Sequence, residues 1–362
     1  MGNEVENLQA LLKQDPSNFQ ARRELAIILT DNGFNEEALS NLEYLQKYFP
    51  EDAELQYNLG ILYEKTKNIK KARKAYEKAI SISPQPDFYY NLGEVLVELK
   101  EWDLAIEALN SVLKTDVNDG NCYFNLGLCY LNKDEINKAT DCFQKAVELN
   151  PKDLYAYFYL GNIYQNNGLT NFAEESYKKV LEISPDYSWA YYNLASIAYK
   201  NDNLDEAREY LSKTILYNDT DIESYKLLAK ICAKQNDYDE MFDLLNTRLS
   251  KEENGDLLYV LAQLYRRTGQ QREYIVCLEQ AIENPLTLTY KIDLVKKELK
   301  NAESQNGNSD FTEEYDEYTS DDEEFSDDEE ENSEDETDSS DFEEDDFDNN
   351  EDIQEELEED TE

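Results

Sequence analysis

Residues 120–153 arrange apolar and polar positions in a pattern that predicts two amphipathic helices joined by a tight turn. In each half the apolar residues recur at helical spacing, and the polar residues 132–135 separate the halves. The apolar positions are Leu126, Gly127, Tyr130, Ala139, Phe143 and Ala146. Pro151 cannot continue the second helix, because it lacks an N–H and its ring clashes with the preceding turn, so it ends the unit.

The same pattern recurs along the chain at a fixed period. Gly93, Gly127 and Gly161 are 34 residues apart, as are Pro151 and Pro185. A period of this length indicates a repeat array, in which units stack because one unit cannot bury its own apolar stripe. A glycine inside a helix costs roughly 1 kcal/mol relative to alanine, so these glycines predict places where another backbone approaches closely.

These units resemble the tetratricopeptide repeat. The resemblance rests on a Leu-Gly or Leu-Ala pair, a following aromatic residue, and then Ala, an aromatic residue or Leu, Ala and Pro at fixed places. It implies an all-α fold, a right-handed α–α superhelix (a TPR solenoid) followed by a disordered tail. It also implies that the first helix of each unit lines a concave groove, and that function lies there.

The spacing predicts eight repeats between an N-terminal half-repeat helix in 1–18 and a closing helix in 288–303. The repeats are 19–52, 53–85, 86–119, 120–153, 154–187, 188–221, 222–254 and 255–287. The pattern weakens toward the end of the array. Met241 and Tyr274 stand where a small residue is usual in the second helix of a repeat.

Charge separates the repeats from the segment that follows them. The chain has 82 acidic and 34 basic residues and a net charge of −48, and residues 304–362 hold 32 of the acidic residues and none of the basic ones. Such a segment cannot bury enough apolar surface to fold, so we predict a disordered tail. A polyanion repels nucleic acid and attracts basic proteins such as histones or ribosomal proteins, or it serves only as a solubilising appendage.

The composition argues against an enzyme, a metal site or a cofactor. The chain has no histidine, and histidine is the commonest metal ligand and the usual acid–base residue near neutral pH. Its five cysteines form no CxxC pair, which favours buried free thiols over a metal or redox site. No signal-peptide pattern and no apolar run of about 18 residues is visible, so we expect a soluble cytoplasmic protein, or a nuclear one in a eukaryotic host, without membrane partners.

An asparagine ladder is the first candidate site. Four asparagines each stand immediately before the Leu of a Leu-Gly or Leu-Ala pair, namely Asn58, Asn91, Asn125 and Asn193. In proteins similar to this one such asparagines face the groove and hold the backbone of an extended peptide, because an amide both donates and accepts. The alternative is that these asparagines are simply solvated.

Aromatic residues stand one position earlier, again at places that the resemblance assigns to the groove. They are Tyr57, Tyr90, Phe124, Phe158, Tyr192 and Tyr259. Aromatic side chains supply large contact area at low entropic cost, which suits recognition of a peptide. The alternative is compositional, since the chain has 28 tyrosines.

A basic patch is predicted in the last two repeats. Lys226, Lys230 and Lys234 share one helical face, and Arg266 and Arg267 follow one repeat later. A solvated lysine face is the alternative. No repeat has Lys followed four residues on by Asn, so the carboxylate clamp by which some relatives dock chaperone termini is not expected.

The leading hypothesis is a non-enzymatic adaptor that binds an extended segment of a partner protein in the groove. The alternative is a chaperone for basic proteins that acts through the acidic tail. A third hypothesis joins the two, with the tail folding back onto the basic patch and competing with ligands.

Overall fold

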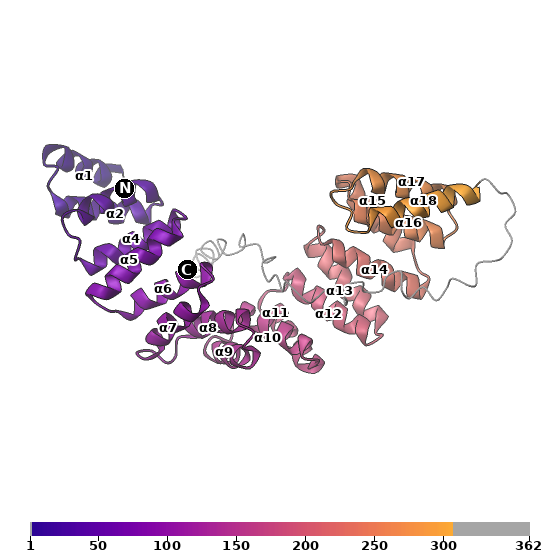
Figure 1. The fold of residues 1–362 in the computed structure, drawn as a ribbon, viewed down its shortest axis with the longest axis horizontal. Helices are drawn as coiled ribbons and strands as arrows, with labels where there is room; N and C mark the ends of the chain where they lie inside the picture. Colours follow the sequence, from indigo (N-terminus) through magenta and orange to yellow (C-terminus); the bar gives the residue numbers. More distant parts are fainter. Residues whose placement is uncertain (1, 307–362) are drawn as a thin grey trace, which may run out of the picture. The chain divides into compact units, whose positions relative to one another are not determined.

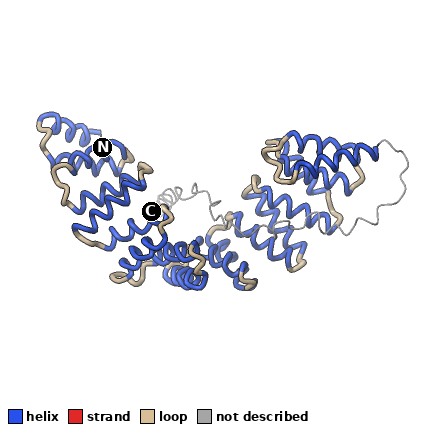
Figure 2. Tube along the Cα trace, viewed as in Figure 1, coloured by secondary structure: helices blue, strands red, loops and turns tan. Residues whose placement is uncertain are grey.

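The computed structural model describes residues 2–306, and within them it contains helices and no strand (Figure 1, Figure 2). This confirms the predicted all-α fold of stacked helical hairpins. The predicted disorder of the acidic tail concerns residues that lie, apart from 304–306, outside the described part of the chain.

Within the described residues, sixteen consecutive helices pair into hairpins between α1 (Gly2–Gln14) and α18 (Ile292–Asn306). The pairs are α2 (Phe19–Asp31) with α3 (Asn35–Gln46), α4 (Ala53–Lys65) with α5 (Ile69–Ile82), α6 (Pro86–Glu98) with α7 (Trp102–Leu113), α8 (Gly120–Asn132) with α9 (Ile136–Leu149), α10 (Leu154–Asn166) with α11 (Thr170–Ile183), α12 (Ser188–Lys200) with α13 (Leu204–Tyr217), α14 (Ile222–Gln235) with α15 (Asp239–Lys251), and α16 (Gly255–Arg267) with α17 (Gln271–Glu283).

The chain divides into two compact units. The first spans Met1–Tyr217 and contains α1–α13, and the second begins at Asn218 and contains α14–α18 in its described part. In the first unit each helix packs against the next one along the chain, so the hairpins stand side by side in sequence order (Figure 1). One core of buried residues runs through α1–α8, and further clusters continue it through α9–α12.

Local sequence determines where the helices begin and where the chain reverses. Asp52, Asp119 and Asp153 cap the first helices of three hairpins, because each side chain accepts a hydrogen bond from a backbone N–H in the first turn. Within the hairpins a left-handed residue reverses the chain, with φ between 56° and 70° at Lys67, Lys100, Asp134, Gly168 and Asp202. This conformation is costly for a residue with a Cβ atom, so helix packing must stabilise the turns that lack glycine.

The periodic glycines allow a side chain, and not a backbone, to come close. A Cβ atom on Gly127 would lie 2.6 Å from the Phe143 ring, and one on Gly161 would lie 2.5 Å from the Tyr177 ring. Gly60 faces Tyr76 in the same way, and Gly93 faces Leu109. The predicted approach of another backbone is therefore wrong. What the missing Cβ atom admits is a large side chain of the second helix, which reaches across the hairpin and becomes fully buried.

The second unit departs from the regular pattern at two places. Met241 of α15 is fully buried where the second helices of the first unit carry alanine, and α14 and α15 pack against each other less closely than the helices of other hairpins do. The closing helix α18 begins at Ile292 and not at the expected 288. The chain before it stays non-helical because its residues bind the start of α16, where Gly255 N–H donates to Thr287 Oγ1 at 2.7 Å.

We predict that Gly127→Ala destabilises the chain by about 1–3 kcal/mol, because overpacking against the buried Phe143 ring exceeds the gain in helix propensity. The measurement is the midpoint of urea unfolding followed by circular dichroism. Gly120→Ala is the matched control, because its Cβ atom would meet Leu149 Cβ at an ordinary 3.4 Å. Equal effects of the two substitutions would contradict this account of the glycine.

Candidate functional site

The predicted asparagines and aromatic residues of the first unit lie on the first helices of successive hairpins, and some of them are linked across hairpins. The Asn91 amide donates to the hydroxyl oxygens of Tyr57, one repeat earlier, and of Tyr76, at 3.4 and 3.3 Å. The Asn125 amide donates to the Tyr90 hydroxyl oxygen at 3.5 Å. The structure thus brings two predicted asparagines together with the predicted tyrosines of the preceding hairpins through long hydrogen bonds.

The linked asparagines retain acceptor capacity. Asn91 is half-buried and Asn125 is 9% exposed, and no described residue donates a hydrogen bond to either side-chain oxygen. The other two members of the predicted ladder differ. Asn58 is exposed, and Asn193 donates to the Trp189 carbonyl within its own helix at 3.1 Å.

The predicted aromatic residues differ in how much surface they offer. Tyr57 is half-buried, with its ring stacked on Phe88 at a centroid distance of 4.6 Å, and Tyr90 and Tyr192 are also half-buried. Phe124 packs against Phe143 of α9 and Tyr159 of α10. Phe158 is only 3% exposed and belongs to the core, which leaves it little surface for a partner.

Two glutamates outside the predicted site lie on the same face as the linked residues. The Tyr76 hydroxyl donates to Glu64, and Glu94 lies near the Tyr90 hydroxyl and the Asn125 amide, which both act to lower its pKa. One sequence signal could have identified Glu94. It stands two residues after the Leu of its Leu-Gly pair, where the neighbouring repeats carry the apolar Ile61 and Leu128.

These carboxyls have perturbed acidities. Burial raises the pKa of Glu64 to about 7, and the neighbouring Glu94 and Glu98 carboxylates add to the rise, while the hydrogen bond from Tyr76 opposes it. Burial likewise raises the pKa of Glu94, although water still reaches its side chain. The α4–α6 surface therefore concentrates acidic groups in partly desolvated positions.

In the second unit, the predicted basic residue Lys226 is held in an internal ion pair. Its Nζ lies 2.8 Å from Asp256, whose side chain is 3% exposed, and 2.8 Å from Glu223. Burial acts to lower the pKa of Lys226, but the hydrogen bonds to these two carboxylates more than offset it and raise the pKa. The Tyr290 ring covers the ammonium group at 5.3 Å.

Asp256 also fixes the connection between α17 and α18. It accepts from the backbone N–H and the hydroxyl of Thr289 at 2.6 and 2.8 Å. Tyr290 then packs on Tyr259, the predicted aromatic position of α16, with ring centroids 4.4 Å apart. The connection between α17 and α18 thus covers Lys226 and Tyr259. Neither the asparagine ladder nor the basic pattern of the sequence predicts this covering.

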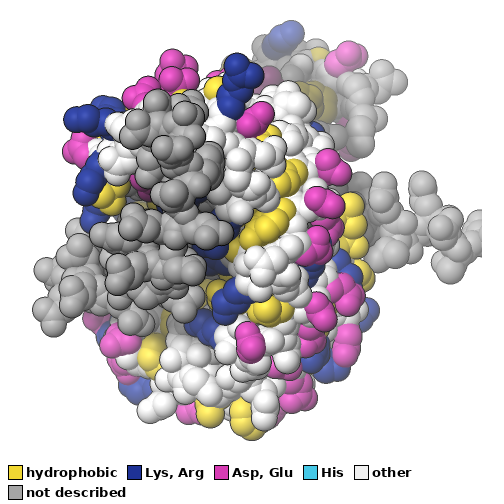
Figure 3. Space-filling view, turned by 90° about the vertical axis from the view of Figure 1, so that its right-hand side faces the viewer, with side chains coloured by type: hydrophobic (Ala, Val, Ile, Leu, Met, Phe, Trp, Pro, Cys, Tyr) yellow, Lys and Arg dark blue, Asp and Glu magenta, His cyan; other side chains and the backbone are white. Residues whose placement is uncertain are grey.

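The other predicted basic residues are more accessible. Lys230 and Arg266 are half-buried, whereas Lys234 and Arg267 are exposed. In the space-filling view of Figure 3, acidic and basic side chains are interspersed with hydrophobic ones across the visible face.

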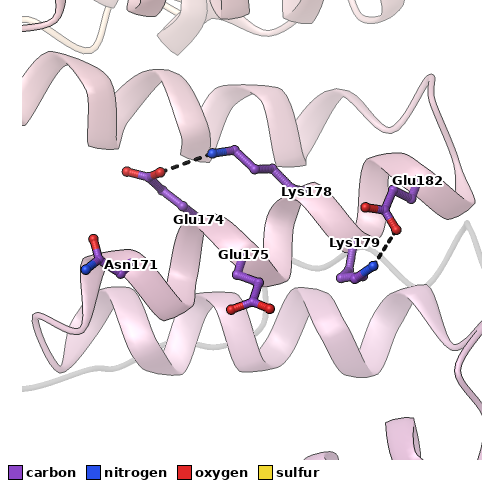
Figure 4. Close-up of a pocket in the computed structure, with 6 residues that line it drawn as sticks. All are labelled: Asn171, Glu174, Glu175, Lys178, Lys179 and Glu182. Carbon is purple, nitrogen blue, oxygen red and sulfur yellow. Dashed lines mark hydrogen bonds and ion pairs between the residues drawn. The ribbon is translucent and has the colours of Figure 1, made fainter.

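A shallow hollow of about 500 Å³ lies on α11, a second helix of its hairpin, away from the predicted positions (Figure 4). Five charged side chains line it, and four of them are paired with one another, Glu174 with Lys178 at 3.2 Å and Lys179 with Glu182 at 2.6 Å. Because both lysines are paired within the hollow, it offers little to an anionic ligand.

The described residues contain no group of three or more potential metal ligands, and none of their helices is long and apolar enough to cross a membrane. The three cysteines of α8 and α9 lie close together. Burial raises the pKa of Cys122 and Cys129 to about 12 and that of Cys142 to about 11, so these thiols are poor nucleophiles.

Six family models, each described as a tetratricopeptide repeat, match the chain. They cover residues 25–87, 87–116, 120–153, 142–174, 171–231 and 255–284. No curated protein matches by sequence.

Among solved structures, MamA residues 41 to the end from Desulfovibrio magneticus RS-1 is 26% identical. It covers 47% of this chain and 97% of its own, with a TM-score of 0.45. YrrB, described as a TPR protein with an unusual peptide-binding site, is 24% identical over 51% of this chain and 96% of its own, with a TM-score of 0.45. A tetratricopeptide repeat protein from Parabacteroides merdae is 16% identical and covers 69% of this chain and 98% of its own, with a TM-score of 0.47.

The raised pKa of Glu64 predicts a pH-dependent stability. Its stabilising contribution is full below pH 4.5, the ordinary value, and is lost as the pH rises through about 7, because the folded chain binds the proton more tightly. Glu64→Gln is neutral at every pH and can still accept from Tyr76. We therefore expect it to be more stable than the wild type at pH 8, and the advantage to disappear at pH 5.

The expected gain at pH 8 is about 1–2 kcal/mol, below the full linkage value because water screens a partly exposed carboxyl. The measurement is the urea midpoint of both proteins at the two pH values. Glu107→Gln, at an exposed position of α7, is the control and should behave alike at both. A Glu64→Gln variant with the same offset at both pH values would show that Glu64 titrates normally.

Proposed function

The chain belongs to the tetratricopeptide repeat family, and from this premise we propose that it is a non-enzymatic adaptor that holds an extended segment of a partner protein. Repeats of this family mediate protein–protein interaction. The proposed binding surface is formed by the first helices of the hairpins in the first unit, where the asparagine and aromatic positions lie.

The arrangement of the asparagine side chains carries this proposal. The Asn91 amide nitrogen is used to hold Tyr57 and Tyr76, which orients the side chain, and its oxygen accepts from no described residue. An oriented acceptor with no internal donor suits the backbone N–H groups of an extended segment. The same holds for Asn125, one repeat further on.

The second unit differs from the first at the aromatic positions. Lys226 and Tyr259, which correspond to Tyr57 and Tyr90, are covered by Tyr290 of the chain's own connection. A partner segment is therefore expected to bind the first unit, because the chain itself occupies these positions of the second unit.

We predict that replacing Asn91, Asn125 and Asn193 by alanine reduces capture of partner proteins from the native lysate by about tenfold or more, because several main-chain hydrogen bonds are lost together. The readout is the amount of each bound protein, quantified by mass spectrometry. Asn110→Ala with Asn137→Ala is the matched control, since both residues are exposed on second helices. Unchanged capture by a folded triple variant would refute the proposed surface.

A second candidate function assigns binding to the acidic segment, because residues 304–362 hold 32 acidic and no basic residues. In this case the clients are basic proteins, and the repeats are their platform. In a joint hypothesis the segment folds back onto the basic patch of the second unit and competes with ligands there; within this patch Lys226 is paired with Asp256.

We predict that residues 1–303 retain discrete partners and that their binding changes little between low and moderate salt. Contacts made by the acidic segment are screened by salt, since the Debye length falls to about 10 Å at 0.1 M. The same capture experiment, run with the full chain and with 1–303 at two salt concentrations, makes the comparison. Loss of all partners on removing 304–362 would favour the chaperone function.

A further inference from the structure

The hairpin of α4 and α5 is the only one of the eight described hairpins that has a net positive charge. From the first residue of α4 to the last residue of α5 it contains seven basic and three acidic residues. In each of the other seven, the acidic residues equal or outnumber the basic ones. On a chain with a net charge of −48, this hairpin is therefore the part of the repeat array that attracts an acidic segment most strongly.

Four of the basic side chains lie on one face of α5. Lys70, Lys74 and Lys78 follow one another at intervals of one helical turn, and Lys71 lies beside them. We name these four lysines the α5 basic face. Three of them are exposed and Lys78 is half-buried, so the face is open to a ligand.

Three of the four lysines have no acidic partner within the described part of the chain. Lys78 pairs with Glu51 at 2.7 Å, whereas Lys70, Lys71 and Lys74 form no ion pair there. The Lys71 ammonium group instead lies 5.1 Å from the centre of the Tyr63 ring. The second helix α11 differs, because both of its lysines pair with glutamates of the same helix.

These charges do not stabilise the helix that carries them. Lys70 and Lys71 lie in the first turn of α5, where the positive end of the helix dipole disfavours cations, and this turn contains no acidic residue. Lys74 also stands four residues from both Lys70 and Lys78, a spacing at which like charges repel. The stability of the hairpin therefore gives no reason for the cluster, whereas a ligand of negative charge does.

The chain itself supplies a ligand of this kind. Residues 307–362, which follow α18 directly, hold 32 acidic and no basic residues. Attachment to the same chain gives this segment a high effective concentration, on the order of millimolar for a short flexible connection, without any further contact. An acidic segment of another protein would have to compete with it, so the chain's own segment is the occupant that charge complementarity favours.

We propose that the α5 basic face docks the chain's own acidic segment, 307–362. Several carboxylates of the segment pair with Lys70, Lys71 and Lys74 at once, which suits a polyanion with closely spaced charges. Because α5 is a second helix, the docked segment leaves the first-helix positions of Asn91 and Asn125 to a partner. The inference goes beyond the proposed adaptor function, and it assigns the segment to a different surface from the basic patch of the second unit.

The test treats the full chain at low salt with a reagent that couples a lysine amine to a carboxyl group in direct contact with it. Mass spectrometry identifies the lysines that become joined to 307–362. An equal mixture of isotope-labelled and unlabelled chains distinguishes contacts within one chain from contacts between two. We expect coupling mainly to the lysines of α5, within one chain, and its loss at about 1 M salt, where the Debye length is about 3 Å.

The test variant is Lys70→Gln with Lys74→Gln, which removes two charges and leaves Lys71 as the reporter. We expect coupling of Lys71 to 307–362 to fall at least about threefold, a modest factor because exposed ion pairs are individually weak. Lys70→Arg with Lys74→Arg keeps both charges and should preserve the coupling. The matched control, Lys114→Gln with Lys152→Gln, removes two charges from exposed positions of the first unit outside α4 and α5 and should preserve it as well. Circular dichroism verifies that every variant folds.

Four results would each overturn the inference. Coupling spread evenly over the exposed lysines of all hairpins would show that the segment has no preferred surface. Coupling concentrated on Lys230 and Lys234 would assign it to the basic patch of the second unit, and coupling between labelled and unlabelled chains would make it a contact between copies. Equal coupling of Lys71 in the glutamine variant and the wild type would show that these charges do not hold the segment. The adaptor function is tested separately, by partner capture with the asparagine variant.

Discussion

The regular part of this molecule depends on one packing constraint, which the four consecutive hairpins from α4 to α11 share. A first-helix residue without a Cβ atom lets a large side chain of the second helix cross the hairpin and become fully buried, as Gly60 does for Tyr76 and Gly127 does for Phe143. A Cβ atom at these positions would clash by a wide margin, so the distance between the two helices is determined tightly. Similar hairpins then stack with a similar offset, and one core runs through them.

The same constraint organises the polar surface. The Tyr76 ring is fully buried against Gly60, while its hydroxyl emerges between Glu64 and Asn91. Tyr177 repeats this arrangement three repeats later, donating to Asn162 and Gln165 at 2.7 and 2.9 Å. A core residue thus positions surface groups, and the orientation of Asn91 follows from packing and not only from its own helix.

The second unit shows what happens when the constraint is relaxed. Met241 and Tyr274 replace small residues, the α14–α15 packing loosens, and polar contacts hold the elements together. Asp256 binds Lys226 and Thr289, and Glu298 of α18 accepts hydrogen bonds from Tyr259, Gln263 and Tyr274. Such buried charges are tolerated only when they are fully paired. Lys226 therefore stabilises the second unit through its ion pair with Asp256 and does not remain available to a ligand.

Sequence alone determined the fold class, the helical hairpins and the family, because a period of 34 residues with Leu-Gly and Ala positions is compatible with few architectures. It also identified Asn91, Asn125, Tyr57 and Tyr90 as surface candidates, although it could not show that they contact one another. Those contacts depend on the offset between neighbouring hairpins, and only the tertiary structure decides that offset.

The same reason explains what sequence missed. Glu64 and Glu94 lie on different helices, and burial among neighbouring helices raises the pKa of each, with a further rise from nearby carboxylates. From the sequence, Lys226 is expected to be solvated or to face the groove. In the structure it is paired with Asp256, thirty residues later. Periodicity is a property of the sequence itself. Desolvation and ion pairing depend on which segments contact one another, and only the tertiary structure decided those contacts.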